Sequence, residues 1–218
     1  MTLARDIPDA TVARLPVYRR ALIELAASGE QNVSSAALAS LAGVNAAKVR
    51  KDLSFIGTSG VRGVGYDVKG LLREIGDALG LDEASPVVIV GMGNLGRALA
   101  DYRGFGSRGF PVAALVDASQ EIIGSRIAGM LVHGPGDVES LVRELDIRVG
   151  IIATPGAAAQ GVADSLVRAG IGSILSFAPT VLHVPDTVPL RKVDLATELQ
   201  ILSFYEQRER DETGGKSA

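Results

Sequence analysis

The chain contains no cysteine and only two histidines among its 218 residues. The lack of cysteine excludes disulfide bonds, thiolate metal sites and cysteine nucleophiles. No apolar run approaches the ~18 residues that a membrane-spanning helix needs, and the N-terminus lacks the layout of a signal peptide. We therefore expect a soluble cytoplasmic protein that contacts no membrane and binds no metal.

The charge is unevenly distributed along the chain. Apolar residues make up 47% of the sequence and charged residues 22%, a balance typical of chains that bury a core. Residues 1–75 contain ten Lys and Arg against seven Asp and Glu, a net charge of +3, although the whole chain carries -3. This small excess permits phosphate binding by the N-terminal part without demonstrating it.

The N-terminal part has the pattern of a helix-turn-helix. Apolar spacing predicts helices over residues 10–28, 36–42 and 46–55. Ser34 or Ser35 can cap the second helix, and Asn45 can cap the third. Leu38 and Leu41 of the second helix are predicted to face inward.

The helix over residues 46–55 is the candidate DNA-reading helix. Val49, Leu53 and Ile56 follow helical spacing and form its predicted buried stripe. Three polar residues are then expected together on the opposite, exposed side: Lys48, Lys51 and Asp52.

The run over residues 58–68 alternates valine or tyrosine with glycine, which predicts a short hairpin, or wing, with Arg62 near its tip. Cations and hydroxyls suit phosphates and guanine edges. The expected DNA-contacting residues are Lys48, Arg50, Lys51, Ser54 and Arg62. A solvated basic face, or a winged helix that contacts protein, remains the alternative.

From residue 87 onward the pattern alternates between strands and helices. Strands are predicted over residues 87–90, 112–116, 149–153 and 173–177, with helices over 95–102, 138–145 and 157–169. This order predicts an α/β fold: a winged-helix domain, then a Rossmann-like domain whose parallel sheet is covered on both faces. We place these domains at residues 1–83 and 84–193. A C-terminal helix over 194–212 follows, with Leu195, Leu199, Leu202 and Tyr205 on one stripe.

The run VVIVGMGNLG is a strand that leads into a glycine-rich turn and a helix. Gly91 permits the tight turn, Gly93 allows a diphosphate to approach, and Gly96 allows close helix packing. Asp117 ends the next predicted strand, about 20 residues further on, where an acid binds the adenosine ribose and favours NAD(H) over NADP(H). The expected cofactor contacts in this turn also include Met92, Asn94 and Leu95.

Two further loops are expected at the same edge of the sheet. Thr154 and Pro155 follow one strand and can lie against the cofactor, although a plain strand-to-helix turn is an equal alternative. The later run SFAP offers Phe177, Ala178 and Pro179 as an apolar wall for a nicotinamide ring, although an ordinary core position for Phe177 is the slightly favoured alternative. Such a wall penalises burial of the cationic ring of NAD⁺, so we expect NADH to bind more tightly.

The residues of an enzyme are missing from these loops. A dehydrogenase needs a proton donor or acceptor beside the hydride position, yet neither His133 nor His183 is expected at a strand end after a cofactor loop. No Tyr-x-x-x-Lys pair is present. We therefore expect a cofactor-sensing regulator rather than an enzyme. The alternatives are a small NAD-dependent dehydrogenase with an accessory domain, and a coenzyme-A-binding domain fused to a winged helix.

The runs KVRKDLSFIGTSGVRGVGYDV, VVIVGMGNLGRALADYRGFGSRGF, ILSFAP and VDLATELQILSFY follow one another in family order. They closely resemble the Rex family of redox-sensing repressors across nearly the whole chain. The resemblance implies a homodimer with exchanged C-terminal helices that binds NADH and NAD⁺. It also implies binding to palindromic operator DNA when NADH is scarce and release when NADH rises. Arg20, Tyr102 and Asp194 resemble the family's switch, in which the aspartate changes partner with cofactor state.

Overall fold

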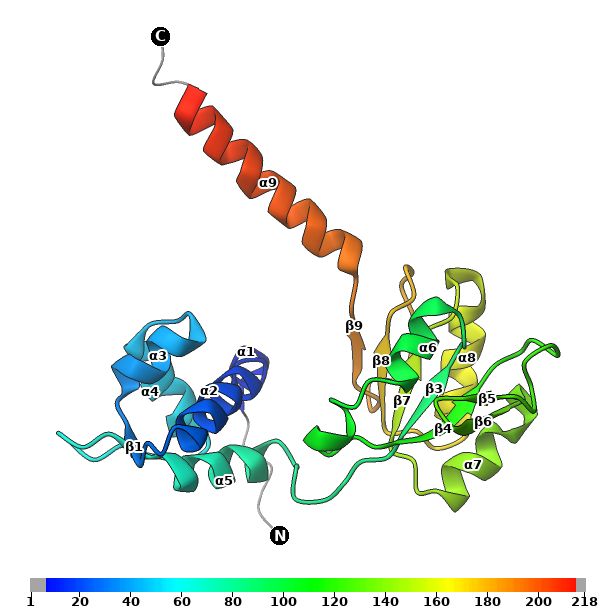
Figure 1. Ribbon diagram of the computed structural model, residues 1–218, viewed down its shortest axis with the longest axis horizontal. Helices are drawn as coiled ribbons and strands as arrows, with labels where there is room; N and C mark the ends of the chain where they lie inside the picture. Colours follow the sequence, from blue (N-terminus) through cyan, green and yellow to red (C-terminus); the bar gives the residue numbers. More distant parts are fainter. Residues whose placement is uncertain (1–6, 215–218) are drawn as a thin grey trace. The chain divides into compact units, whose positions relative to one another are not determined.

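The computed structural model describes residues 7–214 and contains two compact units, Met1–Glu83 and Ala84–Ala218. Figure 1 shows the first as mainly helical and the second as a sheet with flanking helices.

The first unit is a small helical domain with one short pair of strands. Its elements are α1 (Asp9–Val12), α2 (Leu15–Ala27), β1 (Asn32–Val33), α3 (Ser35–Ala42), α4 (Ala46–Phe55), β2 (Tyr66–Asp67) and α5 (Val68–Ala78). Its core is apolar except for the phenols of Tyr18 and Tyr66, and its largest fully buried side chains are Leu15, Tyr18, Leu22, Leu38, Leu53, Leu71 and Ile75.

Both predicted caps of the helix-turn-helix are confirmed. The Ser34 hydroxyl accepts a hydrogen bond from the Ala37 amide at 3.0 Å, and the Asn45 side chain accepts one from the Lys48 amide at 2.8 Å. Between the two helices Gly43 has a φ of +67°, a left-handed conformation that a glycine adopts without strain. The local sequence thus determines where α3 ends and α4 begins.

Three expectations for this unit are wrong. The predicted helix over residues 10–28 is divided into α1 and α2. Leu41 is 50% exposed rather than inward. Asp52 is only 2% exposed, because side chains of α1 and of the start of α2 cover the side of α4 that was expected to face water.

The wing is tighter than a regular hairpin. Its base is the antiparallel pair of β1 and β2, and a single bridge between Val61 and Gly65 closes the loop around Arg62. Gly65 has a φ of +97°, and a Cβ there would lie 2.3 Å from the Val33 carbonyl oxygen. Glycine is therefore required where the wing returns to the domain.

The second unit contains β3 (Val87–Val90), α6 (Asn94–Ala100), β4 (Val112–Val116), β5 (Arg126–Ile127), β6 (Met130–His133), α7 (Val138–Glu144), β7 (Val149–Ile152), α8 (Gly156–Arg168), β8 (Ser173–Ser176), β9 (Leu190–Lys192) and α9 (Leu195–Gly214). Two short 3-10 helices, Gly106–Arg108 and Pro135–Asp137, lie between them.

These strands form one mostly parallel sheet. Its order is β5-β6-β4-β3-β7-β8-β9, and only β5 is antiparallel to its neighbour. The parallel strands taken in chain order are arranged 3-2-1-4-5-6, the Rossmann order, in which ligands bind where the order reverses. Helices α7 and α8 pack on one face and α6 on the other. Strands β5, β6 and β9 were not predicted, because they are short and partly polar.

The last helix, α9, presents apolar side chains to solvent. Leu195, Leu199 and Leu202 are each more than 60% exposed. Ile201 and Phe204 are exposed as well, and at 100° per residue they lie on other sides of the helix than this stripe. The apolar surface is therefore broader than the single stripe that was predicted. Among the described residues, no helix has the length and hydropathy to cross a membrane.

Candidate functional sites

The turn between β3 and α6 brings two backbone segments into contact. Gly91 has a φ of +101°, and a Cβ there would lie 2.8 Å from the Ala153 carbonyl at the end of β7. A Cβ on Gly96 would lie 1.8 Å from the Gly91 carbonyl oxygen. These two glycines are required by the fold, because a side chain on Gly91 would collide with the end of β7 and one on Gly96 would separate α6 from the end of β3.

Gly93 differs from the other two glycines of this turn, Gly91 and Gly96. Its φ is −69°, which any residue can adopt, and a Cβ there would meet no atom within 4 Å. The fold does not require glycine at this position. The residue lines a hollow, so its small size leaves space for a ligand against the backbone at the N-terminus of α6.

This hollow has a volume of about 530 Å³ and lies at the carboxyl ends of β3, β4 and β7. Its lining includes Gly91, Gly93, Asn94, Leu95, Asp117 and Thr154, with Pro155 beside them. The Thr154 hydroxyl is buried and has no hydrogen-bond partner in the described part of the chain. A buried hydroxyl without a partner costs free energy that a bound ligand would recover. The open space at Gly93 and this hydroxyl fit a dinucleotide.

Asp117 lies directly beside the glycine turn. One carboxylate oxygen accepts a hydrogen bond from the Met92 amide at 2.5 Å, and the other accepts one from the Ser119 amide at 2.8 Å. Each oxygen keeps a free lone pair, so the carboxylate can still accept from ribose hydroxyls. The Met92 side chain is 2% exposed and does not line the hollow, so Met92 can contribute only its backbone there.

The rest of the predicted cofactor site is not assembled around this hollow. Phe177, Ala178 and Pro179 are absent from its lining, and Ala178 is fully buried in the core. Their role as a nicotinamide wall stays a prediction. His133 ends β6, contrary to expectation, but does not line the hollow. Asp117 is the one titratable side chain in the described lining.

The predicted DNA-contacting residues divide between two hollows on either side of α4. Lys48 and Lys51 line a hollow of about 400 Å³ against α1. Arg50, Ser54 and Arg62 line another of about 540 Å³ between α3, α4 and the wing. In the second hollow the Arg50 guanidinium donates to the Ser35 hydroxyl at 3.1 Å. The cations thus form two groups rather than one patch.

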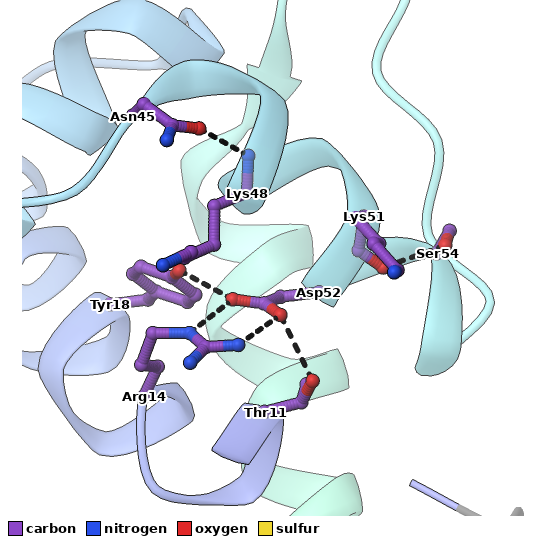
Figure 2. A network of polar contacts seen from close by, with 8 residues as sticks. All are labelled: Thr11, Arg14, Tyr18, Asn45, Lys48, Lys51, Asp52 and Ser54. Atoms are coloured by element: carbon purple, nitrogen blue, oxygen red, sulfur yellow. Dashed lines mark hydrogen bonds and ion pairs between the residues drawn. The ribbon is translucent and has the colours of Figure 1, made fainter. Parts of the chain in front are cut away.

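Asp52 forms the centre of a buried polar cluster that sequence analysis missed (Figure 2). Its carboxylate accepts hydrogen bonds from Arg14 Nε at 2.6 Å, Arg14 Nη2 at 2.7 Å, Tyr18 Oη at 2.7 Å and Thr11 Oγ1 at 2.9 Å. Figure 2 shows these donors converging on Asp52 from α1 and the start of α2. The only signal in the sequence was an acid placed beside the apolar stripe of α4.

The electrostatics of this cluster favour a charged pair. Burial opposes ionisation of Asp52, but hydrogen bonds from Arg14, Tyr18 and Thr11 outweigh it and hold the carboxyl pKa below its usual value. Burial and the hydrogen bond to Asp52 raise the pKa of Tyr18 to about 12. Asp52 is therefore an anion and Tyr18 a neutral donor at physiological pH.

Two of the three predicted switch residues, Tyr102 and Asp194, have other partners in this structure. The Tyr102 hydroxyl accepts from Arg108 Nη1 at 3.1 Å. Asp194 forms an ion pair with Lys192 at 3.2 Å, and its other oxygen accepts from the Ala196 and Thr197 amides at the start of α9. The hydrogen bond with Lys192, then that from Thr197, lowers the pKa of Asp194. Arg20 is exposed on α2. The exchange of partners stays a prediction.

No group of three or more potential metal ligands occurs among the described residues. The polar side chains that line the hollow beside Gly93 are those of Asn94, Asp117, Thr154 and Ser165.

Comparison with family models gives two matches in this chain. Residues 6–54 match the family described as "Putative DNA-binding protein N-terminus", and residues 82–180 match the "CoA binding domain".

Close relatives span nearly the whole chain. The redox-sensing transcriptional repressor Rex of Streptomyces coelicolor is 56% identical over 97% of this chain and 82% of its own length. The repressor Rex of Pelotomaculum thermopropionicum is 44% identical over 97% of this chain and 99% of its own. This chain belongs to the Rex family.

Solved structures agree with this family. The crystal structure of RSP, a Rex-family repressor, has a TM-score of 0.88 and 36% identity over 97% of this chain and 99% of RSP. RSP has also been solved with β-NAD⁺ and operator DNA (TM-score 0.87) and with β-NADH (TM-score 0.84). The names of these relatives confirm the prediction that the chain is a regulator and not an enzyme.

Proposed function

We propose that this chain represses transcription by binding operator DNA when NADH is scarce, and that NADH bound in the hollow beside Gly93 causes release. The observation that carries the proposal is the open space at Gly93, which lies in the same hollow as Asp117 and as the Thr154 hydroxyl, a group with no partner in the described part of the chain. These groups suit a diphosphate at a helix N-terminus and a ribose beside an acid. As a repressor acting on a chromosome, the protein would work in the cytoplasm.

The proposed sensing step depends on the redox state of the nicotinamide ring. NAD⁺ carries a positive charge on the ring and NADH does not, so an apolar wall at Phe177, Ala178 and Pro179 penalises the oxidised form. NADH releases DNA only if it binds the two conformations of the protein with different affinity. We infer that the switch residues Arg20, Tyr102 and Asp194 contribute this difference.

We further propose that the protein acts as a homodimer joined through α9. The part of α9 from Leu195 to Tyr205 exposes apolar side chains on several sides, and such a helix is not stable alone in water. A second copy of the chain suits this surface because palindromic operators are bound by two-fold dimers. Asp194 caps the helix, so it can connect dimerisation to the switch.

The first prediction distinguishes a glycine that the fold requires, Gly96, from Gly93, which leaves space for the ligand. Gly93→Ala should have the same melting temperature as the wild type. It should bind NADH about tenfold to a hundredfold more weakly, because the added methyl group occupies the space left for the ligand. Gly96→Ala should lower stability instead, because its Cβ would collide with the Gly91 carbonyl. Thermal melts and fluorescence titrations with NADH measure both effects. Equal NADH affinity of Gly93→Ala and wild type, or tighter binding of coenzyme A than NADH, would reject the site.

The second prediction concerns the two basic groups on the first unit. Lys51→Ala and Arg62→Ala should each weaken operator binding and lower the slope of log affinity against log salt by roughly one, since each removes a phosphate contact. NADH binding should not change. Lys69→Ala on α5 is the matched control, because Lys69 is exposed but lines neither hollow. Fluorescence anisotropy at several salt concentrations gives the slopes. Identical slopes for all four proteins would show that these hollows do not contact DNA.

The third prediction tests the role of α9. Removal of residues 195–218 should convert dimers into monomers that no longer retain a palindromic operator, while the sheet still binds NADH. Sedimentation velocity gives the assembly state, and anisotropy gives operator binding. A truncated protein that remains a dimer would show that the subunits associate elsewhere.

The fourth prediction tests the switch. Tyr102→Phe should bind NADH normally but lose most of the NADH-induced weakening of operator binding, because a coupling of ~1–3 kcal/mol is comparable to one charge-assisted hydrogen bond. Asp194→Asn should act similarly while keeping the cap of α9, since asparagine also caps helices. Arg108→Gln is the control for the contact that Tyr102 makes in this structure. If Tyr102→Phe retains the wild-type ratio of operator affinities with and without NADH, coupling uses other residues.

A further inference from the structure

We propose that Asp52 is a positioning residue for the DNA-reading helix: its buried carboxylate fixes α4 to the start of α2 and thereby sets how the basic residues of α4 meet DNA. This inference rests on the proposed function, because it concerns how the same helix is held and moved.

The contacts of Asp52 connect three elements through one group. Thr11 lies on α1, Arg14 immediately precedes α2, and Tyr18 lies on α2. Their four hydrogen bonds use both oxygens of a side chain that is 2% exposed. Arg14 donates through two nitrogens, and such bidentate pairing fixes both distance and orientation. The carboxylate therefore restricts the angle of α4 as well as its distance from α2.

Apolar packing alone would hold α4 less specifically. Val49 and Leu53 are fully buried against the core, but contacts between apolar side chains tolerate small shifts that directional hydrogen bonds do not. A buried ion pair is often no more stabilising than apolar side chains of the same volume. Stability therefore does not account for the charged cluster, whereas control of helix orientation does.

The cluster also lies beside the residues that are proposed to contact DNA. Arg14, Lys48, Lys51 and Asp52 line the same hollow of about 400 Å³. Arg14 is paired with Asp52, whereas Lys48 and Lys51 form no ion pair within the part of the chain that the structure describes. A shift of α4 relative to α1 would move both lysines against a bound phosphate backbone.

Helix α2 can pass a displacement to this cluster. Tyr18 faces the interior and is fully buried, whereas Arg20 on the same helix is exposed. At 100° per residue the two side chains point to nearly opposite sides of α2. A force applied at Arg20 would therefore reach Asp52 through one rigid helix and be transmitted to α4.

The test begins with Asp52→Asn in the full-length protein, which removes the charge with little change in shape. Operator and scrambled DNA are titrated by anisotropy, with and without saturating NADH. We expect the preference for operator over scrambled DNA to fall about tenfold, as for loss of one charge-assisted contact. The ratio of operator affinities without and with NADH should also fall toward one, whereas NADH affinity without DNA should be unchanged.

Asp67→Ala is the matched control for lost stability. Asp67 caps α5 by accepting from the Gly70 amide at 2.6 Å, so its removal weakens the same unit without touching α4. This variant should keep both ratios. If Asp67→Ala changes them as much as Asp52→Asn does, general destabilisation explains the effect and the proposal is overturned.

A double variant, Arg14→Met with Asp52→Leu, separates orientation from stability. Apolar replacement should restore the melting temperature but not operator preference or the response to NADH. Tyr18→Phe provides a milder test of the same cluster if Asp52→Asn does not fold, and should shift both ratios in the same direction. A folded double variant with wild-type ratios would overturn the proposal.

The two hypotheses can fail separately. A wild-type protein whose operator affinity does not respond to NADH would reject the proposed function. The preference for operator over scrambled DNA would still report on Asp52 in that case, because it requires an oriented α4 and no cofactor.

Discussion

The close approach of α6 to the end of β3 is the constraint on which the cofactor unit depends. Gly96 permits this approach because any Cβ would overlap the Gly91 carbonyl. With α6 at this distance, its first amides, the end of β7 and the Asp117 carboxylate surround one hollow. In the Rossmann strand order, successive strands are added on one side of β3 and then on its other side. The hollow lies at this point, where the order reverses. The hollow can therefore form only because the backbone of α6 packs directly against the backbone at the end of β3.

In the DNA-binding unit an electrostatic constraint has the corresponding role. A carboxylate that is removed from water must be paired and hydrogen-bonded, and the Asp52 cluster meets this requirement with side chains from α1 and α2. Because Asp52 lies on α4, these hydrogen bonds also fix the position of α4 relative to α1 and α2. The two units therefore organise their sites by different means. In the cofactor unit, glycines without side chains allow backbone segments to approach each other. In the DNA-binding unit, hydrogen-bond donors surround the Asp52 carboxylate.

Local signals predicted much of both units. The caps at Ser34 and Asn45, the left-handed Gly43 and the buried strands β3, β4, β7 and β8 all follow from residues close in sequence. Other features depend on distant partners. The burial of Asp52 depends on Thr11, Arg14 and Tyr18, which are more than 30 residues away. The strands β6 and β9 are short, and pairing with other strands defines them: β6 pairs with β4 and β5, and β9 pairs with β8.

The sequence by itself determined the class of fold, the order of the units and the place of the glycine turn, because periodicity, capping and backbone conformation are local properties. Only the tertiary structure decided which hydroxyl has no partner among the described residues and which side of α4 is buried. Those properties depend on which atoms approach from elsewhere in the chain. A residue such as Asp52 acquires its role from neighbours that its own segment does not contain.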